Sequence, residues 1–381
     1  MDRAAIIGVG MTKIEAAKNR ETFADMAWEA VNKALNDAGM SIDDIDNVIT
    51  TSSDFWDGRT ISCMAVGDAS GAADKNTSCV EGDGTYGAFY GYTRALSGSY
   101  RTTLVTGHSK GSQCISSLIT NAAFDPIYER GLGMDMITAC AMQANAYMHR
   151  TGVTAEDMAR VSVKNHGNAF KNPMAQLPMN ITVQDVISSE MIADPLHKLD
   201  CSPVSDGCCA VIIAHESVAT KFRQKPVWIR GLSFCTDRFF FGDRDLARSH
   251  SLAEAAKTAY KMAGIRDPKK DIDIVELYDA FTYQELLWIE EMGLADYGEA
   301  ARRLKAGDFN LDGPLPVNPS GGLMAGHPVI AAGLYRIAEI VIQLRGDAGE
   351  HQVSKAKTGL AHGVNGLCGQ SHCVWILDKE K

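Results

Sequence analysis

The chain has 381 residues, of which 45% are hydrophobic and 22% charged, and its formal net charge at pH 7 is -10. This length and hydrophobic content predict a well-buried core and two domain-sized units. An acidic chain with no long block of Lys and Arg is a poor candidate for binding nucleic acid.

Taken in chain order, the first residues, 4–9, already have the pattern of a buried strand, with no basic stretch and apolar run of a signal peptide before them. The longest apolar candidate for a membrane span, 329–344, is interrupted by Arg336 and Glu339. We therefore predict a cytoplasmic protein without a membrane segment. The ten cysteines are then expected to be free thiols, and without paired C-x-x-C spacing they predict no metal site.

A weak internal repeat organises the chain. A helix rich in Ala ends at Gly39 and leads through an acidic link to the apolar strand 48–50, and a second such helix ends at Gly264 and leads through an acidic link to the strand 274–277. The strands expected at 102–106 and 208–214 have counterparts at 358–361 and 372–377. One α/β unit therefore occurs twice.

The repeat also sets the expected boundaries. The segment 76–79 is expected to open a helix that runs to about residue 96, and 318–321 leads to a helix expected at 329–344. The internal repeat is interrupted where the first half carries residues that have no counterpart in the second half. We predict an N-terminal half (1–110), an inserted loop or cap domain (111–200), a return to the N-terminal half (201–225) and a C-terminal half (226–381).

Cys79 and His327 are the first candidates for catalysis. At the expected start of a helix, backbone amides and the helix dipole would favour the thiolate of Cys79. His327 lies at the corresponding place in the second half, so packing of the two halves would bring it near Cys79 as an activating base. A structural cysteine and a turn-forming histidine are the alternative interpretations.

These residues belong to a wider set through which nearly the whole chain resembles the thiolase superfamily. The segment from Lys164-Asn165-His166 to Asp194-Pro195 is most similar to its sterol-carrier-type and archaeal branch. The resemblance is carried by Ala5 to Gly10, Ser78-Cys79, Cys201 with Asp206-Gly207, Asn318 to Gly322, Gly326-His327-Pro328 and a Gly-rich loop near the C-terminus.

The resemblance implies an α/β fold of two similar halves, packed as a five-layered α-β-α-β-α structure with an inserted loop domain. It also implies an acyltransferase of the 3-oxoacyl-CoA thiolase type. Cys79 would attack the ketone carbon, the carbon–carbon bond would break, and free CoA would remove the acyl group from Cys79. Coenzyme A would be a co-substrate, with no permanently bound cofactor, and the core would be a homodimer.

The sequence departs from this branch at several positions. Tyr278-Asp279 stands where the branch has His-Asp, so a tyrosine would donate in place of a histidine, with a packed aromatic side chain as the alternative. Ile330 occupies a run that is usually of small residues and would reshape the pocket, beside Phe281. Backbone amides near Cys79 and Gly366 would form an oxyanion hole.

The second acid or base is open between Cys368 and His362. Register favours His362, which aligns with a His-Asn loop of the branch, whereas the chemistry of a proton-shuttling thiol favours Cys368.

Two short motifs of the chain are typical of other functions. Gly107-His108-Ser109-Lys110-Gly111 matches the G-x-S-x-G pattern of serine hydrolases, but the repeat places Ser109 at an ordinary strand end. Gly8-Val9-Gly10 lacks the third glycine of a dinucleotide loop and is read as a simple turn. Within the superfamily, a condensing synthase and a non-catalytic acyl-CoA-binding scaffold subunit remain as alternatives.

Substrate and partner are expectations from the same resemblance. Tyr86, Phe89 and Tyr90, residues 239–241 and Tyr278 would line a pocket for a bulky or aromatic acyl group, as in benzoylsuccinyl-CoA thiolase, although core packing also explains them. Two-component enzymes of this branch have a small zinc-ribbon and oligonucleotide-fold partner. Without a basic cluster in its insertion, this chain is expected to need such a partner to complete the CoA site.

Overall fold

Nine strands form one continuous mixed sheet in the computed structural model, which describes residues 2–381. The N-terminal half contains β1 (Ala4–Met11), α1 (Phe23–Ala38), β2 (Asn47–Thr51), α2 (Asp54–Asp57), α3 (Ser62–Ala65), β3 (Asn76–Val80), α4 (Gly84–Leu96), β4 (Thr102–Lys110), β7 (Asp206–His215) and α9 (Glu216–Ala219). Between β4 and β7 lie α5 (Ser116–Ala122), α6 (Met136–Thr151), α7 (Ala155–Asn168), α8 (Val183–Ile187), β5 (Met191–Ala193) and β6 (Leu196–His197).

The C-terminal half repeats the first. It contains β8 (Val227–Thr236), α10 (His250–Ala263), α11 (Pro268–Asp271), β9 (Ile274–Glu276), α12 (Thr282–Glu291), α13 (Ala300–Lys305), α14 (Ala332–Arg345), β10 (Thr358–Asn365) and β11 (Ser371–Asp378). The strand order is β3-β2-β4-β7-β1-β8-β11-β10-β9, so β2-β4-β7-β1 is mirrored by β9-β10-β11-β8. The two halves meet where β1 pairs with β8 at Ala5–Trp228 and Ile6–Val227.

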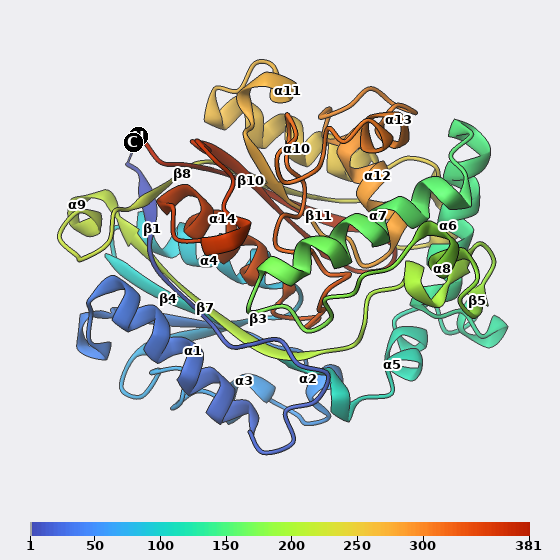
Figure 1. The fold of residues 1–381 in the computed structure, drawn as a ribbon. Helices are drawn as coiled ribbons and strands as arrows, with labels where there is room; N and C mark the ends of the chain where they lie inside the picture. Colours follow the sequence, from blue (N-terminus) through green and yellow to red (C-terminus); the bar gives the residue numbers. More distant parts are fainter. Residues whose placement is uncertain (1) are drawn as a thin grey trace.

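The layers follow from strands that are apolar on both faces. In β7, Cys208, Ala210 and Ile212 pack in the cluster that contains α1, whereas Cys209, Val211 and Ile213 face the cluster that contains α4 and α14. Figure 1 shows α4 and α14 between the two halves of the sheet, with α1 outside the first half and α10 and α12 outside the second. The predicted five-layered α/β fold is confirmed.

Glycines show the repeat at the level of single contacts. Gly10 lies within β1, where a Cβ would stand 2.1 Å from the carbonyl oxygen of Ala30 in α1. Gly231 holds the equivalent place in β8, and its Cβ would stand 2.2 Å from the carbonyl oxygen of Ala259 in α10. The interpretation of the first glycines as a turn was therefore wrong, since their role is to let a helix backbone approach the strand closely.

The segment between β4 and β7 is partly built into the core rather than set apart as a cap. Its helices α6 and α7 pack against α12 of the C-terminal half, and their apolar residues Tyr147, Met158 and Val161 are fully buried in the core cluster of that half. Because α7 is part of the core, its polar residues can contact polar groups of the C-terminal half. Within residues 2–381, no helix combines the length and hydropathy required to cross a membrane.

Candidate active site

A cavity of about 570 Å³ lies where the two halves and the inserted segment meet. Its walls come from the connection between β3 and α4, from α5 and the start of α6, and from five further segments of the chain, 53–56, 201–204, 278–284, 327–330 and 364–369. The chain thus assembles one site from segments that are widely separated in sequence.

A chain of hydrogen bonds crosses this cavity. The hydroxyl group of Tyr278 and Nε2 of His327 lie 2.8 Å apart, and Nδ1 of His327 lies 2.9 Å from Oγ of Ser202. Burial, with a smaller contribution from Arg336, lowers the pKa of His327 to about 3. The imidazole is therefore neutral at pH 7, so one of its nitrogens donates and the other accepts, and the hydroxyl groups of Tyr278 and Ser202 take the complementary roles. The three side chains form a path along which a proton can move.

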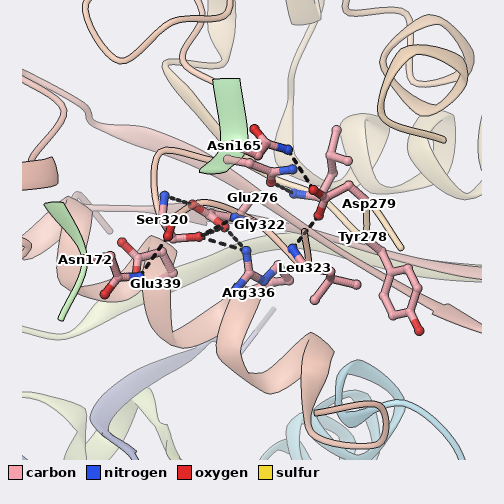
Figure 2. A network of polar contacts seen from close by, with 12 residues as sticks. Asn165, Asn172, Glu276, Tyr278, Asp279, Ser320, Gly322, Leu323, Arg336 and Glu339 are labelled. Atoms are coloured by element: carbon pink, nitrogen blue, oxygen red, sulfur yellow. Dashed lines mark hydrogen bonds and ion pairs between the residues drawn. The ribbon is translucent and has the colours of Figure 1, made fainter. Parts of the chain in front are cut away.

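A buried polar network behind the cavity fixes these groups, and Figure 2 shows the ring of Tyr278 directed away from it. The carboxylate of Asp279 accepts hydrogen bonds from the amide of Leu323 (2.7 Å) and from Nδ2 of Asn165 (2.7 Å) in α7. Burial raises the pKa of Asp279, and the nearby carboxylate of Glu285 adds to this. Asp279 directly follows Tyr278, and its hydrogen bond to Leu323 therefore fixes Tyr278 relative to the loop that precedes His327.

The same loop is held from its other side by a buried ion pair. Glu276 at the end of β9 pairs with Arg336 of α14, and it also accepts from the amide (3.0 Å) and hydroxyl (2.8 Å) of Ser320. Burial raises the pKa of Glu276, while the guanidinium of Arg336 opposes this shift. Sequence reasoning missed this network, because its members are spread over four segments.

Cys79 is placed differently from the expectation. Residues 76–80 form strand β3, and the helix begins only at Gly84, so the predicted helix start at 76–79 was wrong. Cys79 is exposed, its sulfur lies 3.4 Å from Oγ of Ser52, and it is absent from the described residues that line the cavity. The structure does not bring Cys79 and His327 together in this cavity.

Asp83 and Gly84 occupy the helix start instead. The side chain of Asp83 caps α4 by accepting from the amide of Thr85 (3.0 Å), and it accepts from the amide of Gly333 (2.7 Å) at the start of α14. A Cβ on Gly84 would stand 2.5 Å from Cγ of Leu334. The first residue of α4 therefore has no space for a nucleophilic side chain.

The other predicted residues divide between the cavity and the core. Ile330, Phe281, Gly366 and Cys368 line the cavity together with Tyr278 and His327. His362 does not: it is fully buried, its Nε2 lies 2.9 Å from Nδ1 of His372, and burial lowers its pKa to about 3.

The predicted aromatic lining needs a similar correction. Tyr86, Phe89 and Tyr90 and residues 239–241 are absent from the described lining residues. Tyr86 instead donates to Ser371 at 2.7 Å, and Phe241 is buried against Phe124. The aromatic residues that do line the cavity are Phe55, Trp56, Tyr278 and Phe281. Ser109, the candidate hydrolase nucleophile, is buried within β4.

The cavity is acidic. Glu81, Asp83 and Asp135 line it, and among the described lining residues there is no Lys or Arg to hold phosphate groups. The described residues also contain no group of three or more His, Cys, Asp and Glu side chains arranged to hold a metal ion.

Asp83 provides a test of this electrostatic environment, because burial raises its pKa from 3.8 to about 6. Between these pH values the folded chain keeps a proton that the unfolded chain has released, so this carboxyl lowers the free energy of unfolding as the pH rises. We expect the Asp83→Asn variant, which keeps the capping oxygen, to lose this dependence, worth roughly 2–3 kcal/mol between pH 4 and 7. Urea unfolding of both proteins across this range measures it, and parallel pH profiles would contradict the expectation.

Comparison with known proteins supplies the family. The family described as "Thiolase, N-terminal domain" matches residues 4–217, and "Thiolase C-terminal domain-like" matches residues 234–379. An acetyl-CoA acetyltransferase of Methanothermobacter thermautotrophicus is 36% identical over 378 residues, which cover 97% of this chain and 98% of that protein. The benzoylsuccinyl-CoA thiolase subunit BbsB of Thauera aromatica is 35% identical over 239 residues, which cover 62% of each chain.

Two solved structures have the same fold. The Ltp2-ChsH2(DUF35) aldolase matches with a TM-score of 0.86 and 26% identity, covering 100% of this chain and 98% of that chain. Human mitochondrial 3-ketoacyl-CoA thiolase matches with a TM-score of 0.74 and 18% identity, covering 99% of both chains.

Proposed function

Because the chain belongs to the thiolase family, we propose that its cavity makes or breaks a carbon–carbon bond next to the thioester carbonyl of an acyl-CoA. The predicted thiolase-type acyltransferase is confirmed at the level of the enzyme family. The observation that carries the proposal is the 2.8 Å contact between the Tyr278 hydroxyl and Nε2 of the neutral His327. The contact supports a catalytic role against the alternative of a non-catalytic scaffold.

The proposed proton path starts at the substrate. In the cleavage direction, the Tyr278 hydroxyl gives its proton to His327 and takes the proton of a β-hydroxyl group, while the bond between the α and β carbons breaks. The β carbon leaves as a carbonyl group, and the electron pair forms a thioester enolate. The proton then returns from His327 to the α carbon. At the end of the reaction Tyr278 and His327 have regained their original protonation states, so the cleavage requires no further reagent.

Two versions of this chemistry differ in their use of Cys79. In the thiolase version, Cys79 attacks the ketone carbon of a 3-oxoacyl-CoA and passes the acyl group to free CoA, with Cys368 or His362 as the second acid or base. In the aldolase version, a 3-hydroxyacyl-CoA is cleaved without a covalent intermediate. The position of Cys79 outside the cavity lining and the filled space beside Gly84 favour the second version. The 0.86 TM-score match to a protein described as an aldolase supports it too.

Cys79→Ala is the variant that separates the two versions. We expect it to keep turnover within about threefold, because the cavity groups of the proton path are untouched. The assay measures acyl-CoA products from linear and aromatic 3-oxoacyl- and 3-hydroxyacyl-CoAs, with intact-protein mass spectrometry in the absence of free CoA. An acyl adduct on Cys79 that disappears when CoA is added, together with a loss of more than a hundredfold in Cys79→Ala, would contradict the aldolase version. Cys63→Ala, at the neighbouring thiol, is the matched control.

The acyl group is proposed to be bulky. The cavity holds about 570 Å³ and has four aromatic side chains in its wall, Phe55, Trp56, Tyr278 and Phe281. The partial match to a benzoylsuccinyl-CoA thiolase subunit supports an aromatic substrate as one member of this class. We expect aromatic or branched acyl-CoAs to be turned over faster than the linear four-carbon acyl-CoA with the same 3-oxo or 3-hydroxy group in the same assay, and a preference for the four-carbon compound would exclude a bulky substrate.

A partner subunit is proposed to complete the CoA site. The described lining of the cavity has three acidic residues and no basic residue, which is unsuited to the phosphate groups of CoA. The aldolase with the similar fold carries ChsH2(DUF35) in its description, which supports a small zinc-ribbon and oligonucleotide-fold protein as the partner, beside a homodimeric core. Full turnover by the isolated chain would exclude an obligatory partner.

A further inference from the structure

Two cysteines from distant parts of the chain touch behind the cavity wall. Sγ of Cys140 in α6 lies 3.4 Å from Sγ of Cys368, and the two residues are 228 positions apart. Both are almost completely buried, with 0% and 1% of their surface exposed, but Cys368 belongs to the cavity lining and Cys140 does not. A small reagent that enters the cavity therefore meets Cys368 first.

We infer that Cys140 and Cys368 are a modification site, at which a two-electron oxidant such as hydrogen peroxide forms a reversible disulfide. The sulfur of Cys368 attacks one peroxide oxygen, the O–O bond breaks, and the thiol proton goes to the departing oxygen, so the products are a sulfenic acid and water. The sulfur of Cys140 then displaces the hydroxyl group from Cys368, and its proton leaves with that group as a second water. Two thiols are oxidised, one peroxide is reduced, and thiol reductants reverse the reaction.

The local geometry suits this order of events. A disulfide has an S–S distance of about 2.05 Å, so the sulfurs must approach by roughly 1.4 Å. Cys140 is held in a helix, whereas Cys368 lies in a loop between two strands at a φ of 46°, so the loop is the part that moves. The guanidinium of Arg244 donates to the carbonyl oxygens of Leu367 (2.7 Å) and Cys368 (2.6 Å), which keeps this loop against the cavity and places a positive charge near the attacking sulfur.

Cys140 is suited to the second step. Burial raises its pKa well above the usual value for a thiol, so Cys140 does not react with the oxidant itself, and its sulfur lies 3.4 Å from that of Cys368, within reach of the sulfenic acid. The disulfide would join the inserted segment to the loop of residues 366–369, which is part of the cavity wall. Oxidation is therefore expected to restrict the movement of that wall.

The test uses the full chain with Cys63→Ser, which removes the separate thiol pair that Cys63 forms with the exposed Cys79. Reduced protein is treated with hydrogen peroxide, remaining thiols are blocked with N-ethylmaleimide, and peptides are mapped by mass spectrometry without reduction. We expect a linked peptide pair containing Cys140 and Cys368, a higher Tm because the crosslink closes a long loop, and slower hydrogen exchange over residues 364–370. Dithiothreitol should reverse all three changes.

Cys140→Ser in the same background is the matched control. It should show no linked pair and no rise in Tm, while Cys368 is oxidised beyond the sulfenic acid for want of a resolving thiol. Cys201, which also lines the cavity and whose sulfur donates to the carbonyl oxygen of His197, should stay outside the crosslink. Oxidation of Cys79 without any reaction at Cys368, or oxidised Cys368 without a link to Cys140, would show the inference to be wrong.

Discussion

Tyr278→Phe is expected to lower turnover by about 10²–10⁴-fold, the range for loss of a general acid or base. The variant keeps the aromatic ring but removes the hydroxyl group that contacts Nε2 of His327 at 2.8 Å. Without this hydroxyl group, the proton of the substrate's β-hydroxyl group has no acceptor in the proposed path, so cleavage of the carbon–carbon bond slows. The measurement is kcat with the best acyl-CoA substrate, together with a thermal unfolding curve to show that the fold is intact.

Tyr260→Phe is the matched control for this prediction. Tyr260 is also buried and donates one hydrogen bond, to the carbonyl oxygen of Met292 at 2.9 Å, but it is a core residue of α10 and is not among the described lining residues of the cavity. We expect a loss of about 1 kcal/mol in stability and unchanged kcat. Equal losses of kcat in the two variants would remove Tyr278 from the proposed proton path.

Arg336→Leu is expected to lower the free energy of unfolding by about 3–5 kcal/mol, because it leaves the fully buried carboxylate of Glu276 without its counter-charge. Urea unfolding measures the loss. The loss should shrink as the pH falls, since an unpaired Glu276 can take up a proton and avoid a buried charge.

The exposed pair between Arg302 and Glu299 gives the comparison. Both side chains are largely in solvent, and Arg302→Leu should change the free energy of unfolding by no more than about 0.5 kcal/mol. Similar effects in the two variants would show that Arg336 is not paired with Glu276 in the folded protein. Partial rescue of Arg336→Leu by a second change, Glu276→Gln, is expected because the amide carries no charge.

Periodicity and glycine signals were sufficient to predict the layered α/β fold. The alternation of apolar residues and the stops at Gly39 and Gly264 are local properties, and both glycines end their helices with a positive φ of 68° and 75°. The start of α4 was missed, because the small residues of 76–80 fit a strand and a helix equally well. Only pairing with β2 decides in favour of the strand.

The site was predicted in part. His327 and Tyr278 stood out because each lies in a motif, and both line the cavity. Ser202 was missed, although it follows Cys201 in a motif that was noted, since a serine acquires a role here only through its 2.9 Å contact with His327. His362 was misplaced because register along the chain does not reveal that the imidazole of His372 lies beside it. Such contacts depend on packing between distant segments, which spacing cannot reveal.

The mirrored strand order on either side of the β1–β8 pairing gives four strands of one half counterparts in the other half. A single unit that joined a second copy of itself edge to edge would produce the same sheet, with identical residues at the two helix starts that meet in the middle. In the present chain the two helix starts differ: Asp83 precedes α4 as its N-cap and accepts a hydrogen bond from the amide of Gly333, the second residue of α14. Because both halves belong to one chain, each helix start can carry its own residue: Asp83 caps α4 with its side chain, whereas Ala331 precedes α14 without a side-chain cap.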